Sequence, residues 1–117
     1  MKNLVIHSTN GKEPDLMSYE DMGYSYIINK DGYISKLSPP DDIRFPLDTL
    51  SGKSIHIAYV GKDDDCDWTW EQHDSMEVFV KYHYLTNPNI KVYQYNINIK
   101  PWLKDLGIKE KNIKNAS

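Results

Sequence analysis

Two histidines stand where the sequence could support metal or acid–base chemistry. His7 directly follows the apolar run Leu4-Val5-Ile6, and His56 lies inside the apolar run 54–60. A neutral imidazole can bind a metal ion or accept a proton, so a histidine at the end of a strand is a candidate functional group. A histidine within an apolar strand is more often a hydrogen-bonded core residue, and we assign that role to His56.

The other two histidines and the cysteine do not form a metal-binding or catalytic pattern in the sequence. His73 and His83 lie on one expected helix, about three turns apart, and so cannot chelate one ion together. Cys66 stands in the acidic segment 63–67, whose successive aspartates are more typical of a solvated turn than of the spaced ligands of a calcium loop. A lone cysteine cannot form an internal disulfide. No Ser-His-Asp, Cys-His or glycine-rich phosphate pattern occurs in a fitting context.

Composition excludes several classes of function. A chain of 117 residues with 39% hydrophobic and 26% charged residues can bury one modest core. Its net charge of −3 is opposite in sign to a nucleic-acid-binding surface, so no nucleic-acid partner is expected. No apolar run approaches the roughly 18 residues of a membrane span, and no signal-peptide pattern is present. We therefore expect a cytoplasmic protein without a membrane partner.

Apolar runs and turn residues predict the elements that position these side chains. Asp31-Gly32 predicts a tight hairpin turn between one strand and a return strand that begins at Tyr33. Thr69 and Gln72 form a capping-box pattern that opens a helix over 69–85. A short helix is expected over 101–107, another over 14–22, and a long loop over 36–53. The strands are expected at residues 4–7, 24–29, 54–60 and 91–96.

These elements predict an α/β protein: a single domain with a central mixed β-sheet flanked by helices. The long helix is expected to pack on the sheet through Met76, Phe79 and Val80, which recur at helical spacing. The domain is expected to cover residues 1–108. Residues 109–117 are expected to form a polar, frayed C-terminal tail.

Five segments, taken in order, carry a resemblance to a known family. They are 5–9, the hairpin that begins at Gly23-Tyr24, the strand 54–61, the helix start at Thr69 and Gln72, and Trp102-Leu103. The order resembles the zinc-dependent N-acetylmuramoyl-L-alanine amidases and peptidoglycan recognition proteins, the phage-lysozyme-like fold. The resemblance implies that His7 stands at a zinc-ligand position and that Tyr24 lines the catalytic site.

A comparison with the zinc ligands of that family implies that this chain has lost the zinc site. The family holds zinc with two histidines and a cysteine or aspartate, which leaves one position open for water. At the position of the second histidine this chain has Gln94 or Tyr95, and the loop that carries the third ligand is shortened to 98–101. We therefore expect no metal ligand set, no cofactor and no catalytic residue.

Three functions remain open from the sequence. The first is a catalytically inactive, amidase-like protein that binds a small polar ligand or peptide, for example a phage or mobile-element protein that sequesters a signal or inhibits a host factor. The second is an active amidase whose ligands are placed differently or come from another chain. The third is a protein-interaction module that uses its tyrosine-rich surface on a host protein; the oligomeric state is left open. The binding pocket expected for the first function contains His7, Tyr24, Arg44, Phe45, Gln94 and Tyr95.

Overall fold

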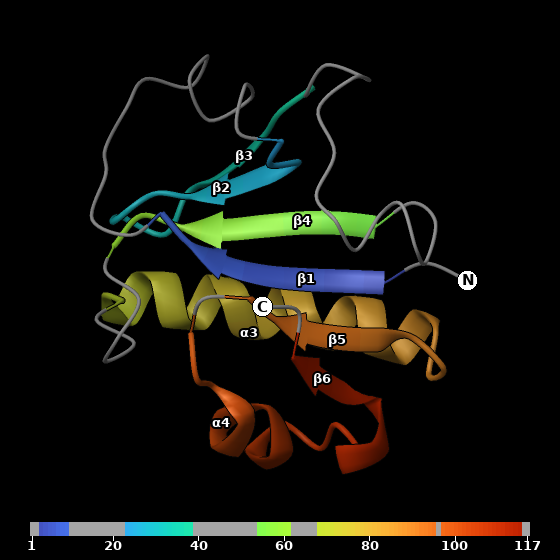
Figure 1. Cartoon of the computed structure of the whole chain (residues 1–117). Coiled ribbons are helices and arrows are strands. Elements are labelled where there is room, and N and C mark those ends of the chain that lie inside the picture. Colours follow the sequence, from blue (N-terminus) through green and yellow to red (C-terminus); the bar gives the residue numbers. More distant parts are fainter. Residues whose placement is uncertain (1–2, 10–22, 39–53, 62–67, 96, 116–117) are drawn as a thin grey trace.

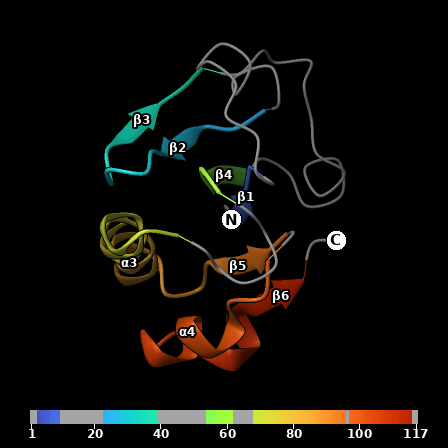
Figure 2. The same cartoon turned by 90° about the vertical axis from the view of Figure 1, so that its left-hand side faces the viewer.

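In the described residues, a six-stranded mixed sheet carries two α-helices on one of its faces (Figures 1 and 2). The computed structural model describes residues 3–9, 23–38, 54–61, 68–95 and 97–115. Along the sheet the strand order is β3-β2-β4-β1-β5-β6. Only the β2–β3 pair is antiparallel, and each other neighbouring pair is parallel. The strands are β1 (Asn3–Ser8), β2 (Tyr26–Ile28), β3 (Ile34–Lys36), β4 (Ser54–Tyr59), β5 (Lys91–Gln94) and β6 (Ile113–Asn115). The predicted α/β class and mixed sheet are confirmed.

The hairpin turn between β2 and β3 has the geometry that Asp31-Gly32 predicts. Gly32 has a φ of 89°, in the left-handed region that favours glycine. The turn also lies against the start of the long helix, since a Cβ added to Gly32 would come within 2.8 Å of the Glu71 carbonyl oxygen. The hydroxyl of Thr69 donates to the Lys30 carbonyl oxygen at 2.6 Å. Glycine therefore serves both the turn and the close approach of the helix.

The long helix α3 (Trp70–Thr86) begins at the predicted capping box. The Gln72 amide donates to the Thr69 hydroxyl oxygen at 3.1 Å, and the Thr69 amide donates to Oε1 of Gln72 at 2.8 Å. The buried Gln72 side chain then donates through Nε2 to the carbonyl oxygens of Ile28 and Val60, at 3.1 and 2.9 Å. One side chain thus caps the helix and joins it to the ends of β2 and β4.

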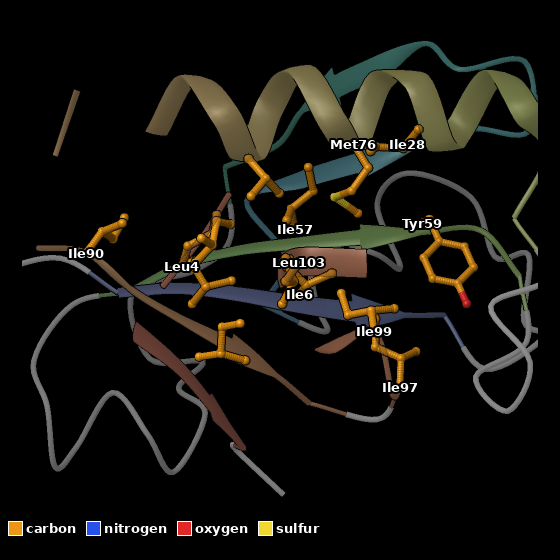
Figure 3. Packing of buried hydrophobic residues seen from close by; sticks show 14 residues of the cluster. Leu4, Ile6, Ile28, Ile57, Tyr59, Met76, Ile90, Ile97, Ile99 and Leu103 are labelled. Atoms are coloured by element: carbon orange, nitrogen blue, oxygen red, sulfur yellow. The ribbon is translucent and has the colours of Figure 1, made fainter. Parts of the chain in front are cut away.

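The main core lies between the sheet and the two helices, α3 and α4 (Lys100–Asp105). Met76 and Val80 of α3 are fully buried, Phe79 is half-buried, and Leu103 contributes from α4. The predicted packing face of α3 is therefore confirmed. Figure 3 shows Met76 and Leu103 packed among the buried side chains of the cluster; the labelled set is Leu4, Ile6, Ile28, Ile57, Tyr59, Met76, Ile90, Ile97, Ile99 and Leu103.

The opposite face of the sheet carries a second, smaller apolar cluster. Successive residues of a strand point to opposite faces, so Ile27 and its register partner Ala58 face away from the helices. They pack with Tyr24, Leu37 and Val60. The sheet is consequently buried on both faces at its central strands, as expected for parallel strands.

The C-terminal segment corrects the sequence prediction of a frayed tail. A 3-10 turn, η1 (Glu110–Asn112), leads into β6, which pairs in parallel with β5. The Asn112 side-chain amide donates to the Ile90 carbonyl oxygen at 2.9 Å, and Ile113 is buried. The Lys100 ammonium donates to the Glu110 carboxylate at 2.9 Å and holds the pKa of that carboxyl below its ordinary value. The tail prediction is therefore wrong for residues 110–115, because two buried side chains in a polar stretch are too few to form a sequence pattern.

Other predicted elements have different bounds in the structure or lie outside the described residues. The strands predicted at 24–29 and 91–96 are shorter, at Tyr26–Ile28 and Lys91–Gln94. The helix predicted over 14–22, most of the loop over 36–53 and the acidic segment 63–67 lie outside the described residues. Within the described ranges, neither helix has the length and apolar character needed to cross a membrane.

Candidate functional site

The predicted site residue His7 forms a buried hydrogen bond with His56 of the neighbouring strand. In the parallel register of β1 and β4, Val5 lies opposite His56 and His7 lies opposite Ala58. His7 and His56 therefore point to the same face of the sheet, the face away from the helices. Nε2 of His7 lies 2.9 Å from Nδ1 of His56, and both side chains are almost completely buried. One ring must donate the proton of this bond and the other must accept it.

The surroundings keep His7 neutral. Burial lowers the pKa of His7 well below its ordinary value of 6.5, because the imidazolium form loses hydration. The neighbouring His56 lowers the pKa further, because two positive charges at this distance repel. A neutral imidazole at neutral pH can donate or accept a hydrogen bond, but it is not a standing positive charge for an acidic ligand.

Two predicted tyrosines complete a ring cluster around His7. The Tyr24 ring meets the His7 ring edge-on at a centroid distance of 5.1 Å, and the Tyr95 ring lies at 4.6 Å from it. Tyr24 precedes β2 and is buried, whereas Tyr95 follows β5 and is half-buried. We call His7, His56, Tyr24 and Tyr95 the His7 cluster. Two strands and the ends of two others, far apart in the sequence, thus bring four side chains capable of hydrogen bonding to one place.

The geometry does not bring Gln94 into this cluster. Gln94 lies opposite Ile6 in the register of β5 and β1, and so points to the face that carries the helices. Its Oε1 accepts from the Ile99 amide at 2.8 Å, and its Nε2 donates to Oδ1 of Asn115 at 2.7 Å. These bonds position the start of α4 and the end of β6. The prediction that Gln94 lies beside His7 and Tyr24 is wrong. Neighbouring residues of a strand point to opposite faces, so Tyr95, the next residue, lies beside His7 instead.

Two predicted site residues lie outside the described part of the chain, and one residue of the His7 cluster was not predicted to belong to the site. Arg44 and Phe45 lie outside the described residues, so their expected closure over the pocket stays a prediction. His56 was assigned from sequence to the hydrogen-bonded core, and it is buried and hydrogen-bonded. Its partnership with His7 was not predicted. Because residues alternate between the two faces along a strand, His56 and Ala58 lie on the same face of the sheet. Only the register between β1 and β4 shows that His7 lies on that face too.

The donor set of the cluster does not fit a zinc site. In the part of the chain that the structure describes, no three His, Cys, Asp or Glu side chains gather in a way that could hold a metal ion. His7 and His56 aim one nitrogen each at the other, and among the described residues Tyr24 and Tyr95 also make ring contacts with His7. A neutral phenol is a poor zinc ligand compared with the His, Cys and Asp or Glu ligands of known sites.

Comparison with solved structures places this fold among the amidases and peptidoglycan recognition proteins. The chain is similar to the N-acetylmuramoyl-L-alanine amidase LysC from Clostridium intestinale URNW, with a TM-score of 0.65, 16% identity, and coverage of 92% of this chain and 87% of that one. It is also similar to the endolysine N-acetylmuramoyl-L-alanine amidase LysCS from the same organism, with a TM-score of 0.63, 18% identity, and coverage of 92% and 85%.

A recognition protein from an animal shares the same architecture. Peptidoglycan recognition protein-1 from Manduca sexta aligns with a TM-score of 0.53 and 18% identity, over 79% of this chain and 65% of that one. No protein-family model and no curated protein sequence matches the chain. At these identities the likeness shows the fold, and the fold agrees with the family that the sequence motifs resemble.

Proposed function

We propose that this chain is a binding protein built on the amidase fold, and that the His7 cluster contacts a small polar ligand or peptide without zinc catalysis. Similar folds are carried by proteins named as N-acetylmuramoyl-L-alanine amidases and as peptidoglycan recognition proteins. A fragment of peptidoglycan, with a lactyl-peptide stem on an amino sugar, is therefore the first ligand class to examine. Because a fold hosts many functions, the argument rests on the site.

The hydrogen bond between His7 and His56 is the observation that carries this proposal. A zinc ligand must aim a nitrogen lone pair at the ion from about 2.0–2.1 Å, and catalytic sites use three protein ligands. Here Nε2 of His7 meets a nitrogen of His56 at 2.9 Å, and the described residues supply no third ligand of an ordinary kind. Nε2 of His7 is thus engaged by a protein nitrogen, which supports recognition over hydrolysis.

The chemistry of the cluster suits a polar ligand with an apolar part. Tyrosine rings offer apolar contact area and a hydroxyl that donates or accepts, which is why such rings are common where small ligands bind. Tyr95 is the half-buried member, whereas His7 and Tyr24 are buried. A ligand is therefore expected to meet Tyr95 first and to use its hydroxyl and ring.

A titration with a defined muramyl peptide tests the proposal. The full chain should show saturable binding by calorimetry, and Tyr95→Ala should weaken it by at least about tenfold, equivalent to about 1.4 kcal/mol. Tyr95→Phe separates loss of the hydroxyl from loss of the ring. Tyr33→Ala is the matched control, because Tyr33 is an exposed tyrosine of the hairpin turn. Absence of saturable binding, or equal weakening by Tyr33→Ala and Tyr95→Ala, would contradict the proposed site.

A further inference from the structure

All three tryptophans of the chain gather where α3 begins and α4 passes it. The rings of Trp68 and Trp102 lie 4.9 Å apart, and His73 lies between 5.6 and 5.9 Å from each of the three indoles. An open groove of about 410 Å³ runs here, lined by Trp68, Thr69, Trp70 and His73. We call it the tryptophan groove.

The tryptophan groove is separate from the His7 cluster. The ring of Trp68 packs against Tyr59 at 5.3 Å, and Tyr59 belongs to the core on the helix-bearing face. His7 points to the opposite face of the sheet. A ligand in the groove would therefore not touch the His7 cluster, and its binding does not depend on the function proposed above.

The His73 side of the groove is held in place by a hydrogen bond. The indole N–H of Trp102 donates to Nε2 of His73 at 2.9 Å, and an indole nitrogen can only donate. His73 must therefore accept at Nε2 and carry its proton at Nδ1, which lies 3.3 Å from the Asp74 carboxylate. Trp68 and Trp70 meet the imidazole at 83° and 74°, so the rings form steep walls rather than a flat stack.

The composition of the groove points to a positively charged ligand. Trp70 is 79% exposed at the first turn of the helix, so a large aromatic ring is presented to solvent. Asp74 is four residues further on, hence on the same side of α3, and is also exposed; Glu71 is an exposed carboxylate in the same turn. The face of an indole ring attracts cations, and the carboxylates add attraction for a cation and repulsion for an anion.

We propose that the tryptophan groove binds an organic cation that carries a quaternary ammonium group. Such a group has no hydrogen-bond donors to satisfy and gives up its water more readily than a compact ammonium ion. Aromatic walls with a nearby carboxylate are the surroundings that stabilise it. The groove is open and its carboxylates are solvated, so the expected half-saturation is on the order of millimolar.

A pair of ligands that differ only in charge tests this assignment. The full chain is titrated with choline and with 3,3-dimethylbutan-1-ol, its neutral analogue of the same shape, while the three indole N–H resonances are followed by NMR. Choline should shift the Trp70 and Trp68 resonances saturably, and the neutral analogue should bind at least about fivefold more weakly. Equal binding of both ligands, or no saturable shift with choline, overturns the proposal. Saturable binding of N-acetylglucosamine in place of choline also overturns it.

Three variants locate the site. Trp70→Ala should abolish the choline response, and Asp74→Asn should weaken it by about two- to fivefold through loss of the carboxylate charge. Tyr82→Ala is the control, because Tyr82 is an exposed aromatic residue on the same helix, three turns away. Trp70 and Asp74 are exposed, so both variants should unfold at the wild-type temperature. Unchanged affinity in Trp70→Ala or in Asp74→Asn overturns the proposal.

Discussion

Nε2 of His7 and Nδ1 of His56 lie 2.9 Å apart inside the sheet, although 49 residues separate the two histidines in the sequence. The parallel β1–β4 register puts both rings on one face, and Tyr24 and Tyr95 surround His7 there. The bond needs one ring nitrogen as acceptor, so it exists only while the pair does not carry two positive charges. Both the polar character of the site and its response to pH follow from this bond.

Stability should fall on acidification below the pKa of an unfolded histidine. Burial and His56 lower the pKa of folded His7 well below 6.5, so below that pH the unfolded chain binds a proton that the folded chain does not. The free energy of unfolding should decrease by up to about 1.4 kcal/mol per pH unit, from about pH 6.5 down to the folded-state pKa. Above pH 6.5 His7 should add no slope. Urea unfolding of wild type and His7→Gln between about pH 5 and pH 7.5 checks this, and equal slopes in the two proteins would refute it.

The double role of Gln72 should make it sensitive to substitution. Gln72→Met removes half of the capping box and leaves the Val60 carbonyl oxygen without its Gln72 donor, whereas the Ile28 carbonyl oxygen still accepts from the Val60 amide. A buried carbonyl oxygen without a donor costs about 1–3 kcal/mol and the lost cap about 1 kcal/mol, so a loss of about 2–4 kcal/mol in the free energy of unfolding is expected. Glu71→Ala, at the exposed neighbouring position, should cost about 0.5 kcal/mol. Chemical denaturation measures both, and similar losses would argue against the role given to Gln72.

The two sides of α3 should respond differently to truncation. Met76 is fully buried between α3 and the sheet, so Met76→Ala should cost about 2–5 kcal/mol through lost contacts and a cavity. Val78 is 68% exposed two residues away, and Val78→Ala should change stability by less than about 0.5 kcal/mol. Urea denaturation of both variants checks the assignment of the buried face. A larger loss for Val78→Ala would mean that this side of α3 is covered in solution.

The C-terminal strand should contribute to stability. Asn112 donates to the carbonyl oxygens of Pro88 and Ile90, at 3.0 and 2.9 Å, and so joins η1 to the loop before β5. Asn112→Ala should cost about 1–3 kcal/mol, because the buried Ile90 carbonyl oxygen loses its side-chain donor. Lys111→Ala, at an exposed neighbouring position, is the control. A melting temperature that is unchanged in Asn112→Ala would restore the interpretation of this segment as a frayed tail.

Local signals in the sequence predicted much of the fold. The hairpin turn at Asp31-Gly32 and the helix start at Thr69 and Gln72 depend on residues that are close together in the chain, and both are confirmed. The packing side of α3 was also predictable, because Met76 and Val80 lie four residues apart along a regular helix. Each of these features follows from backbone geometry that operates over a few residues.

Features that depend on strand register were not predictable to the same extent. Tyr95 and Gln94 are neighbours, and only the pairing of Ile6 with Gln94 shows which of the two faces His7. A shift of one residue exchanges the faces of a strand, so motif order alone does not decide this point. Strand β6 was missed for a related reason: its pairing with β5 supplies the stability that its polar sequence does not indicate.

Zinc content tests the central claim most directly. The described residues offer two mutually hydrogen-bonded imidazoles where a catalytic zinc site has three protein ligands and a water. The full chain, purified, incubated with zinc and desalted, should contain well under one equivalent of zinc by elemental analysis. A chelator should leave its melting temperature unchanged, and it should release no peptide from muramyl peptides. One equivalent of zinc, lost in His7→Ala together with amide-bond cleavage, would contradict this account and identify the chain as an active amidase.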